Sequence, residues 1–149
     1  MTTPPDGPPA LPVTFRPTRT RAVLLSVGLA QFLVITAVAL ALPELTGGER
    51  ASFVAIALVL LAGLLLLSRP KVEAHSGGVR VVNLTTTREL AWEEIVQVNL
   101  RPGDAWAHLD LTDGTSQPAM GIQPGIGRQR AIADARALRE LTRTHTAGQ

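Results

Sequence analysis

The stretch that decides the fold is residues 22–42, AVLLSVGLAQFLVITAVALAL, which contain no ionisable side chain. An α-helix of this length extends about 30 Å, which matches the hydrocarbon thickness of a bilayer. A second uncharged run, ASFVAIALVLLAGLLLL, occupies residues 51–67 between Arg50 and Arg69. Arginines at both ends extend the reach of a short span, because their charged heads reach the interface. The sequence therefore predicts two transmembrane helices, at 22–42 and 51–68.

A short loop, PELTGGER at residues 43–50, joins the two runs. Its proline and its paired glycines predict a tight turn between antiparallel helices. Basic side chains flank the hairpin at Arg16, Arg19, Arg21, Arg69 and Lys71. Because positive residues stay on the cytoplasmic side, we expect a cell-membrane protein with two spans, cytoplasmic termini and an external loop.

A cleaved signal peptide is the competing interpretation of the first run, because Ala39-Leu40-Ala41 has the small-x-small pattern of a cleavage site. The run exceeds the usual length of a signal-peptide apolar region, and the second run would still anchor the product. We therefore favour the uncleaved hairpin. It lacks the ionisable groups at membrane depth that pumps use, so we interpret it as an anchor. Gly28 and Gly63 permit close helix contact, although single small residues are a weak signal.

Residues 1–20 hold six of the eleven prolines and few large apolar side chains. Such a segment cannot bury enough surface to offset its ordering entropy, so we predict a disordered cytoplasmic tail. The run PPDGPPALP also has the composition of a ligand for a proline-recognising groove.

The composition excludes several functional classes. The chain has no cysteine, so disulfides, thiolate catalysis and cysteine-based zinc sites are absent. Its formal charge is only +2, and it shows no basic stripe interleaved with aromatic residues, so we expect no nucleic-acid partner. Arginine far outnumbers lysine, which is typical of a high-GC genome. We also predict no cofactor, and we identify no small-molecule substrate.

From residue 69 onward the pattern changes to short alternating segments separated by turns. Turns are indicated at 76–78, at Arg101–Asp104 and at Asp113-Gly114. In the segment EEIVQVNL, Val96, Val98 and Leu100 alternate onto one face, which predicts a strand. Residues 128–144 have an apolar stripe at helical spacing. The sequence thus predicts about six antiparallel strands forming a small barrel or sandwich, closed by the C-terminal helix.

The segments GGVRVVN, RELAWEEI and LDLTDGT, together with the arginine-rich final helix, carry a family resemblance. They resemble the bacterial pleckstrin-homology-like (PH-like) domains that follow two transmembrane helices in small actinobacterial membrane proteins. The resemblance is specifically to the low-molecular-weight protein antigen 6 family, and it covers residues 69–144 and the preceding hairpin. It implies a PH-like fold for residues 69–149, and it brings no enzymatic activity and no functional residues. Some members of that family are described as secreted antigens, so a processed and secreted form is an alternative.

The adjacent carboxylates of Glu93 and Glu94 suggest an acid/base pair beside Trp92. Neighbouring side chains point to opposite faces of a strand and diverge by about 100° on a helical turn, so the two cannot converge on one substrate. We therefore predict a strand-entry corner with Trp92 buried as a structural residue and both glutamates solvated.

Trp106, His108 and Asp110 alternate onto one strand face, opposite Ala107, Leu109 and Leu111. Two ligand types on one strand are too few for a metal site, so we predict a solvated face and no metal. The pairs Ser76 with His75 and Ser116 with His108 suggest a nucleophile and a base. Neither is accompanied by a nucleophile elbow or an oxyanion loop.

The segment GIQPGIGRQR, residues 121–130, places glycines before a helix but lacks the Lys-Ser/Thr of a P-loop. Arg128 and Arg130 at this helix start, together with Arg69 and Lys71, are candidate contacts to anionic lipid or to a protein partner. The alternative is that these cations only keep the surface soluble.

These features predict a membrane-anchored PH-like module that acts as a non-enzymatic scaffold at the cytoplasmic face. Its expected partners are the bilayer and a membrane protein or a second copy of itself. An anionic-lipid headgroup sensor is the alternative, and a hydrolase that uses His108 or the glutamates is a third class.

Overall fold

The computed structural model of the chain describes residues 7–148. The described chain divides into two units: a helical hairpin, Thr18–Arg69, and a β-rich domain. The domain is built from residues on both sides of the hairpin, namely those up to Pro17 and those from Pro70 onward. The hairpin is therefore an insertion within the sequence of the domain.

The hairpin consists of α1 (Thr18–Ala41) and α2 (Gly47–Leu67). Both helices are long and apolar enough to cross a membrane. They pack closely at Gly28, where an added Cβ would lie 3.1 Å from Leu61 Cδ1. The two predicted helical runs are confirmed as helices, and each begins about one turn earlier than the sequence indicated.

The predicted Gly-Gly turn in the connecting loop is wrong, because both glycines lie in the first turn of α2. A capping box starts the helix instead. The Thr46 amide donates to Glu49 Oε2 at 2.8 Å, and the Glu49 amide donates to Thr46 Oγ1 at 3.3 Å. These bonds satisfy amides that a helix start leaves unpaired, which explains the earlier beginning of α2.

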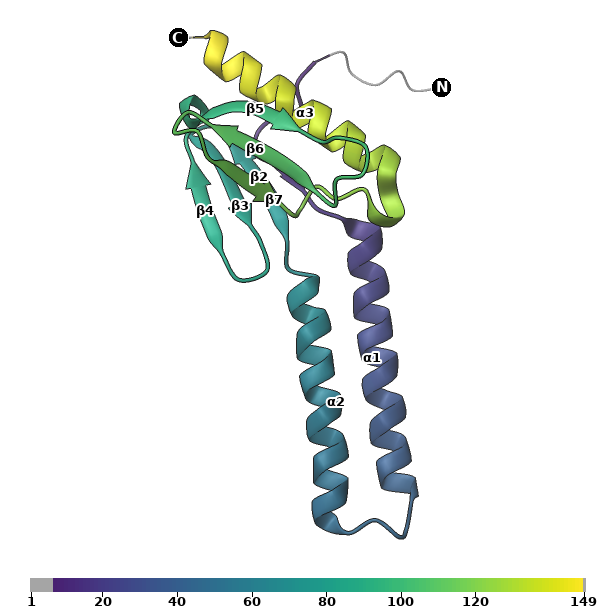
Figure 1. The fold of residues 1–149 in the computed structure, drawn as a ribbon. Coiled ribbons are helices and arrows are strands. Elements are labelled where there is room, and N and C mark those ends of the chain that lie inside the picture. The colour runs from purple at the N-terminus through teal and green to yellow at the C-terminus, as the bar shows by residue number, and fades with distance from the viewer. Residues whose placement is uncertain (1–6, 149) are drawn as a thin grey trace. The chain divides into compact units, whose positions relative to one another are not determined.

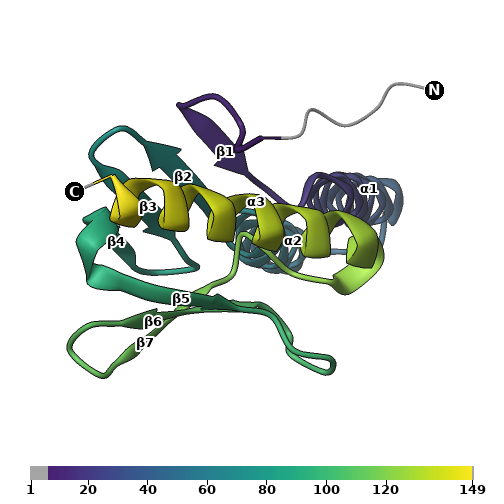
Figure 2. The ribbon, with the colours of Figure 1, turned by 90° about the horizontal axis from the view of Figure 1, so that it is seen from above.

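The first sheet of the domain has four antiparallel strands in the order β1-β2-β3-β4 (Figure 1, with β1 labelled in Figure 2). Its strands are β1 (Val13–Phe15), β2 (Lys71–His75), β3 (Gly78–Val82) and β4 (Thr87–Leu90). The predicted turn between β2 and β3 is confirmed at Ser76-Gly77. Neighbouring strands pair in sequence order, with β1 and β4 at the two edges.

Strand β1 corrects the prediction of a disordered tail over residues 1–20. Val13, Thr14 and Phe15 pair with Ala74, Glu73 and Val72 of β2. The physical reason is that Phe15 buries its ring in the core of the domain and is only 5% exposed. Residues 1–6 of the predicted tail lie outside the described residues.

The second sheet has three antiparallel strands, β5 (Ile95–Asn99), β6 (Ala107–Leu111) and β7 (Ser116–Ala119). The predicted alternation is confirmed on β6, where Ala107, Leu109 and Leu111 are buried. On β5 it is wrong at Val96, which is 64% exposed. A register shift between Ile95 and Gln97 inserts an extra residue there and turns Val96 outward.

The sequence predicted a barrel or a sandwich, and the sandwich is confirmed: the two sheets stay separate in their hydrogen bonding and do not close into a barrel. Two 3₁₀ turns interrupt the chain: η1 (Trp92–Glu94) between β4 and β5, and η2 (Gly125–Gly127) before the last helix. That helix, α3 (Arg128–Ala147), lies across the opening between the sheets (Figure 2). Its buried residues are Ala131, Ala135, Leu138, Leu141 and Thr142, which confirms the predicted C-terminal cover.

Candidate functional site

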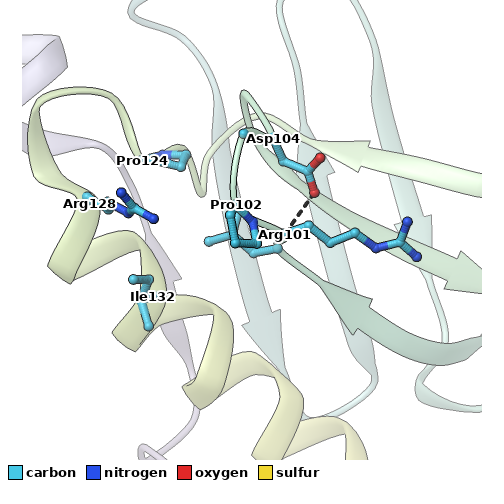
Figure 3. A pocket seen from close by; sticks show the side chains of 8 residues that line it. Arg101, Pro102, Asp104, Pro124, Arg128 and Ile132 are labelled. Carbon is cyan, nitrogen blue, oxygen red and sulfur yellow. Dashed lines mark hydrogen bonds between the residues drawn. The ribbon is translucent and has the colours of Figure 1, made fainter.

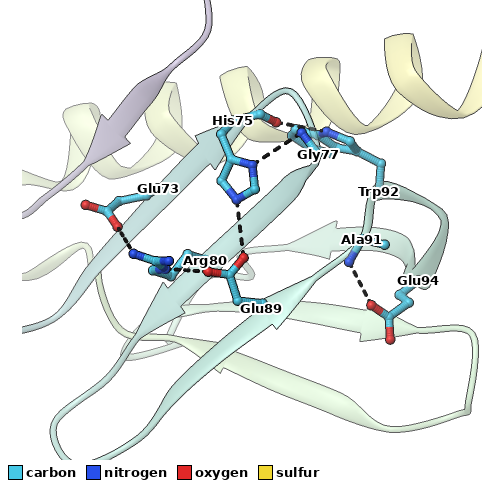
Figure 4. A network of polar contacts seen from close by, with 8 residues as sticks. All are labelled: Glu73, His75, Gly77, Arg80, Glu89, Ala91, Trp92 and Glu94. Carbon is cyan, nitrogen blue, oxygen red and sulfur yellow. Dashed lines mark hydrogen bonds and ion pairs between the residues drawn. The ribbon is translucent and has the colours of Figure 1, made fainter.

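The corner at Trp92 is a structural element, as the sequence predicted. The indole is only 3% exposed, and its Nε1 donates to the backbone oxygen of His75 at 3.1 Å (Figure 4). Its ring stacks on His145 of α3, with centroids 4.4 Å apart and planes 14° apart. Trp92 therefore joins the first sheet to the C-terminal helix.

Glu93 and Glu94 are separated by the same corner. Glu93 is exposed, whereas Glu94 folds back so that its Oε2 accepts the Ala91 amide at 2.7 Å. Figure 4 shows the Glu94 carboxylate turned toward the start of η1. Glu94 caps this short turn, and the pair does not form an acid/base site.

A network of charged side chains covers the outer face of the first sheet (Figure 4). Glu89 accepts from Arg80 Nε and lies 3.3 Å from His75 Nε2. The hydrogen bond from Arg80 holds the pKa of the Glu89 carboxyl below its usual value. Arg80 also lies 3.8 Å from Glu73. Every carboxylate of the network is matched by a cation across neighbouring strands, which identifies it as a cross-strand stabilising feature.

The second sheet brings together three residues that the sequence marked as candidate chemistry. His108, Asp110 and Ser116 line one polar hollow with Asn99, Arg101 and Asp104. Asp110 accepts from Asn99 Nδ2, and the Arg101 amide donates to Asp104 at 2.8 Å. Within residues 7–148, no group of three or more His, Cys, Asp or Glu side chains is placed to hold a metal ion.

The candidate interaction site is the surface between α3 and the segment formed by β5 and the turn that follows it, and we call it the β5–α3 groove. It contains two hollows. The larger, about 370 Å³, is lined by Val96, Gln97, Val98, Arg139, Thr142 and Arg143. The smaller, about 240 Å³, is lined by Leu100, Arg101, Pro102, Gly103, Asp104, Pro124, Arg128 and Ile132 (Figure 3).

Arginines of α3 line the helical side of this groove. Arg128, Arg139 and Arg143 fall within about 60° of one another around the helix axis at 100° per residue. Figure 3 shows Arg128 extending from the start of α3 over the smaller hollow, whereas Arg101 projects away from the helix. The groove therefore places guanidinium groups of α3 beside a lining of mixed polarity, which suits an acidic partner segment.

Arg139 closes part of the groove itself. Its Nε and Nη2 both donate to the backbone oxygen of Val98, at 3.2 and 2.8 Å. Because β5 is an edge strand, this fork satisfies a carbonyl that would otherwise be left open to pairing. Arg139 thus fixes α3 against β5, and Arg128 and Arg143 are the exposed cations that α3 contributes to the groove.

The four predicted contact cations have different environments. Lys71 forms an ion pair with Glu73 on β2, and Arg69 belongs to the hairpin unit. Arg130 projects about 200° around α3 from Arg128, and its Nε lies 4.0 Å from Asp134. Of the four, Arg128 alone lines the β5–α3 groove among the described residues.

Three residues important to this arrangement were missed from the sequence. Phe15 lies in a strand too short to show a period. Buried Asn83 joins the two sheets, since its Nδ2 donates to Pro118 O at 2.9 Å and its Oδ1 accepts the Met120 amide at 3.1 Å. Asn83 follows an apolar strand and Arg139 lies in an arginine-rich helix. Both are ordinary places for a polar surface residue, so nothing in the sequence indicated that Asn83 joins the sheets or that Arg139 binds β5.

The two sheets, the corner and the capping helix define a PH-like domain. A family model described as a bacterial PH domain matches residues 69–141, which confirms the PH-like prediction. The match does not carry the antigen 6 family name, which stays a resemblance. It also begins after β1 and the hairpin, so these parts lie outside the matched residues.

Relatives of the chain occur in mycobacteria. It is 37% identical over 87 residues to Uncharacterized protein Rv1417 of Mycobacterium tuberculosis and to Uncharacterized protein Mb1452 of Mycobacterium bovis. Each match covers 58% of this chain and 56% of the relative, so the chain spans little more than half the length of these relatives. No solved structure matches the chain significantly.

Proposed function

We propose that the protein is a membrane-anchored PH-like module that binds protein partners at the cytoplasmic face and catalyses no reaction. The observation that carries this proposal is the insertion of the apolar hairpin between the paired strands β1 and β2. Two linkers, Arg16–Pro17 and Ser68–Pro70, connect the strands of the domain to the helices of the hairpin. Because both linkers are short, the domain is confined to the membrane surface, which raises its effective concentration toward membrane partners.

The orientation follows from the flanking charges. Arg16 precedes α1 and Arg19 and Arg21 lie in its first turn, whereas residues 43–50, at the other end of the hairpin, carry two Glu and one Arg. Positive flanks stay inside, so the domain is cytoplasmic and the loop is external. A non-catalytic role agrees with the PH family, whose members are typically binding modules.

The first experiment determines the membrane topology. Because the chain has no cysteine, each introduced cysteine is the single labelling site of its variant. Single cysteines at exposed Glu44 and Thr112 are labelled with a membrane-impermeant maleimide. Glu44 is preferred to Thr46, which caps α2. We expect Glu44→Cys to react in intact cells and Thr112→Cys only after permeabilisation. Reaction of both in intact cells overturns the proposal and favours an exported domain.

The docking surface is the β5–α3 groove, and its partner is an acidic segment of a membrane protein. A photo-crosslinking residue at exposed Gln97, inside the groove, is compared with one at exposed Thr86, in the loop of the first sheet. We expect captured partners at Gln97 that disappear in the Arg143→Glu variant. Equal capture at both positions shows that the groove is not the docking surface.

A headgroup sensor is the second candidate, and the position of Arg128 over the smaller hollow favours it. Because Phe15 pairs with Val72, a short linker in place of residues 16–70 yields a continuous domain that keeps β1. Its flotation with phosphatidylglycerol vesicles is compared with flotation with phosphatidylcholine vesicles. Salt-sensitive binding lost in Arg128→Ala and kept in Arg130→Ala supports the sensor, and no binding at low salt excludes it.

A further inference from the structure

Gln31 is a polar side chain without a partner inside the apolar hairpin. Its Nε2 and Oε1 are both buried, and neither has a hydrogen-bond partner within residues 7–148. It lies near the middle of α1, a depth at which a bilayer offers no water. An amide at this depth has to find its donor and acceptor in protein, so Gln31 indicates a contact beyond the single hairpin.

An apolar groove lies beside Gln31. Its volume is about 490 Å³, and it is lined by Gln31, Val59, Leu60, Gly63, Leu64 and Leu67. The α2 residues recur at helical spacing and so form one face of that helix. At Gly63, nothing lies within 4 Å of the position that a Cβ would occupy, so the backbone of α2 is open to close approach there.

The other candidate small residue is already used within the hairpin. An added Cβ at Gly28 would lie 3.1 Å from Leu61 and 3.3 Å from Leu64, so this glycine serves the packing of α1 on α2. Val59, by contrast, is 71% exposed on the groove face. The groove at Gly63 therefore remains as the surface on which another helix has room to pack closely.

We propose that this groove is a dimerisation surface and that its occupant is a second copy of the chain. The proposal rests on the insertion of the hairpin into the membrane. A glutamine amide is both donor and acceptor, so two Gln31 side chains facing each other across a twofold axis satisfy one another reciprocally. The rotatable bonds of the side chain allow the amide to turn from the seam between α1 and α2 into the groove.

The experiment uses the purified full-length protein in lipid vesicles. Val59→Cys, in the groove, is compared with Leu58→Cys, which lies about 100° around α2 and outside the groove lining. A short bifunctional maleimide is added at increasing lipid dilution. We expect crosslinked dimers from Val59→Cys and few from Leu58→Cys.

Two further substitutions test the mechanism in the Val59→Cys background. Gln31→Leu introduces an apolar side chain of similar size and removes donor and acceptor, and we expect about tenfold weaker self-association, as for a strong interhelical hydrogen bond. Gly63→Leu fills the groove, and we expect the loss of the crosslinked dimer. Unchanged tryptophan fluorescence checks that the variants fold.

Each other outcome has a distinct meaning. A chain that is embedded but stays monomeric, or whose dimer survives both substitutions, overturns the dimerisation surface and leaves the membrane anchor intact. Crosslinking of Val59→Cys in native membranes only to a different protein also overturns self-association. A chain that alkaline carbonate releases from membranes contradicts the proposed function itself.

Discussion

The most informative prediction concerns Phe15, in a segment that the sequence assigned to a disordered tail. The change is Phe15→Ala in the full-length chain. Phe15 contributes its ring to the core of the domain from strand β1, which pairs with β2 across the hairpin insertion. We expect this single change to destabilise a domain whose matched sequence begins more than fifty residues later.

The expected cost follows from the burial of the ring. Replacing a buried Phe by Ala typically costs about 3–5 kcal/mol. Because β1 has only three residues and lies at a sheet edge, the site relaxes more easily, and we expect about 3 kcal/mol. Domains have only about 5–15 kcal/mol of total stability, so this loss is large. For a domain of this size it lowers Tm by about 12–24 °C.

The assay is thermal unfolding in detergent, followed by the fluorescence of buried Trp92. Thr14→Ala is the matched control, because Thr14 lies on the same strand but its side chain is exposed. We expect the control to change the free energy of unfolding by less than about 0.5 kcal/mol. Equal Tm values for the two variants would refute the placement of β1 in the domain.

Three further predictions concern the domain. Trp92→Ala should lower the free energy of unfolding, measured by chemical denaturation, by about 3–5 kcal/mol. Trp92→Phe keeps most of the apolar area and loses the indole hydrogen bond, so it should cost about 1–2 kcal/mol. Equal losses of stability in the two variants would contradict the packing of Trp92. Arg80 lowers the pKa of Glu89 in the folded state below its ordinary value of about 4.5. The Glu89 carboxylate therefore stabilises the fold at pH values above this ordinary pKa, and its contribution is lost as pH falls through the folded pKa. Glu89→Gln should flatten the acid limb of a stability–pH curve, and a parallel curve would exclude this source. Gly121→Ala places a Cβ 2.6 Å from the backbone of β2 and should lower Tm markedly, whereas Gly127→Ala, with its nearest atom at 3.9 Å, should fold normally by circular dichroism.

Local periodicity explains which sites were predictable. The alternation of Ala107, Leu109 and Leu111 is visible in the five letters AHLDL, and the structure buries all three. Trp92 was predictable for a similar reason, since a large aromatic between two strand patterns needs a core to cover it. The outward position of Val96 was not predictable, because the bulge adds one residue and buries both Ile95 and Val98 while Val96 points outward, without changing the composition.

The β5–α3 groove lay beyond sequence reasoning for a different reason. One side of it comes from β5 and the following turn and the other side from α3, and β5 and α3 are joined by the hydrogen bonds from Arg139 to the Val98 carbonyl. Every residue type carries the same backbone carbonyl, so the sequence does not show which carbonyl will accept a hydrogen bond from a side chain. The arginines of α3 were visible in the sequence. Whether each one lines the groove, forms an ion pair or bonds to the Val98 carbonyl depends on which side of the packed helix it occupies.

The sequence by itself determined the two apolar helices, the alternating strands and the amphipathic last helix, because each is written in the period of neighbouring residues. Only the tertiary structure decided that Phe15 completes the sheet from the far side of the hairpin and that Asn83 ties one sheet to the other. It alone also decided that Gln31 is left with an unpaired amide. These three facts depend on which segments distant in the chain come to lie beside each residue, and that is selected by the packing of the whole molecule rather than by local pattern.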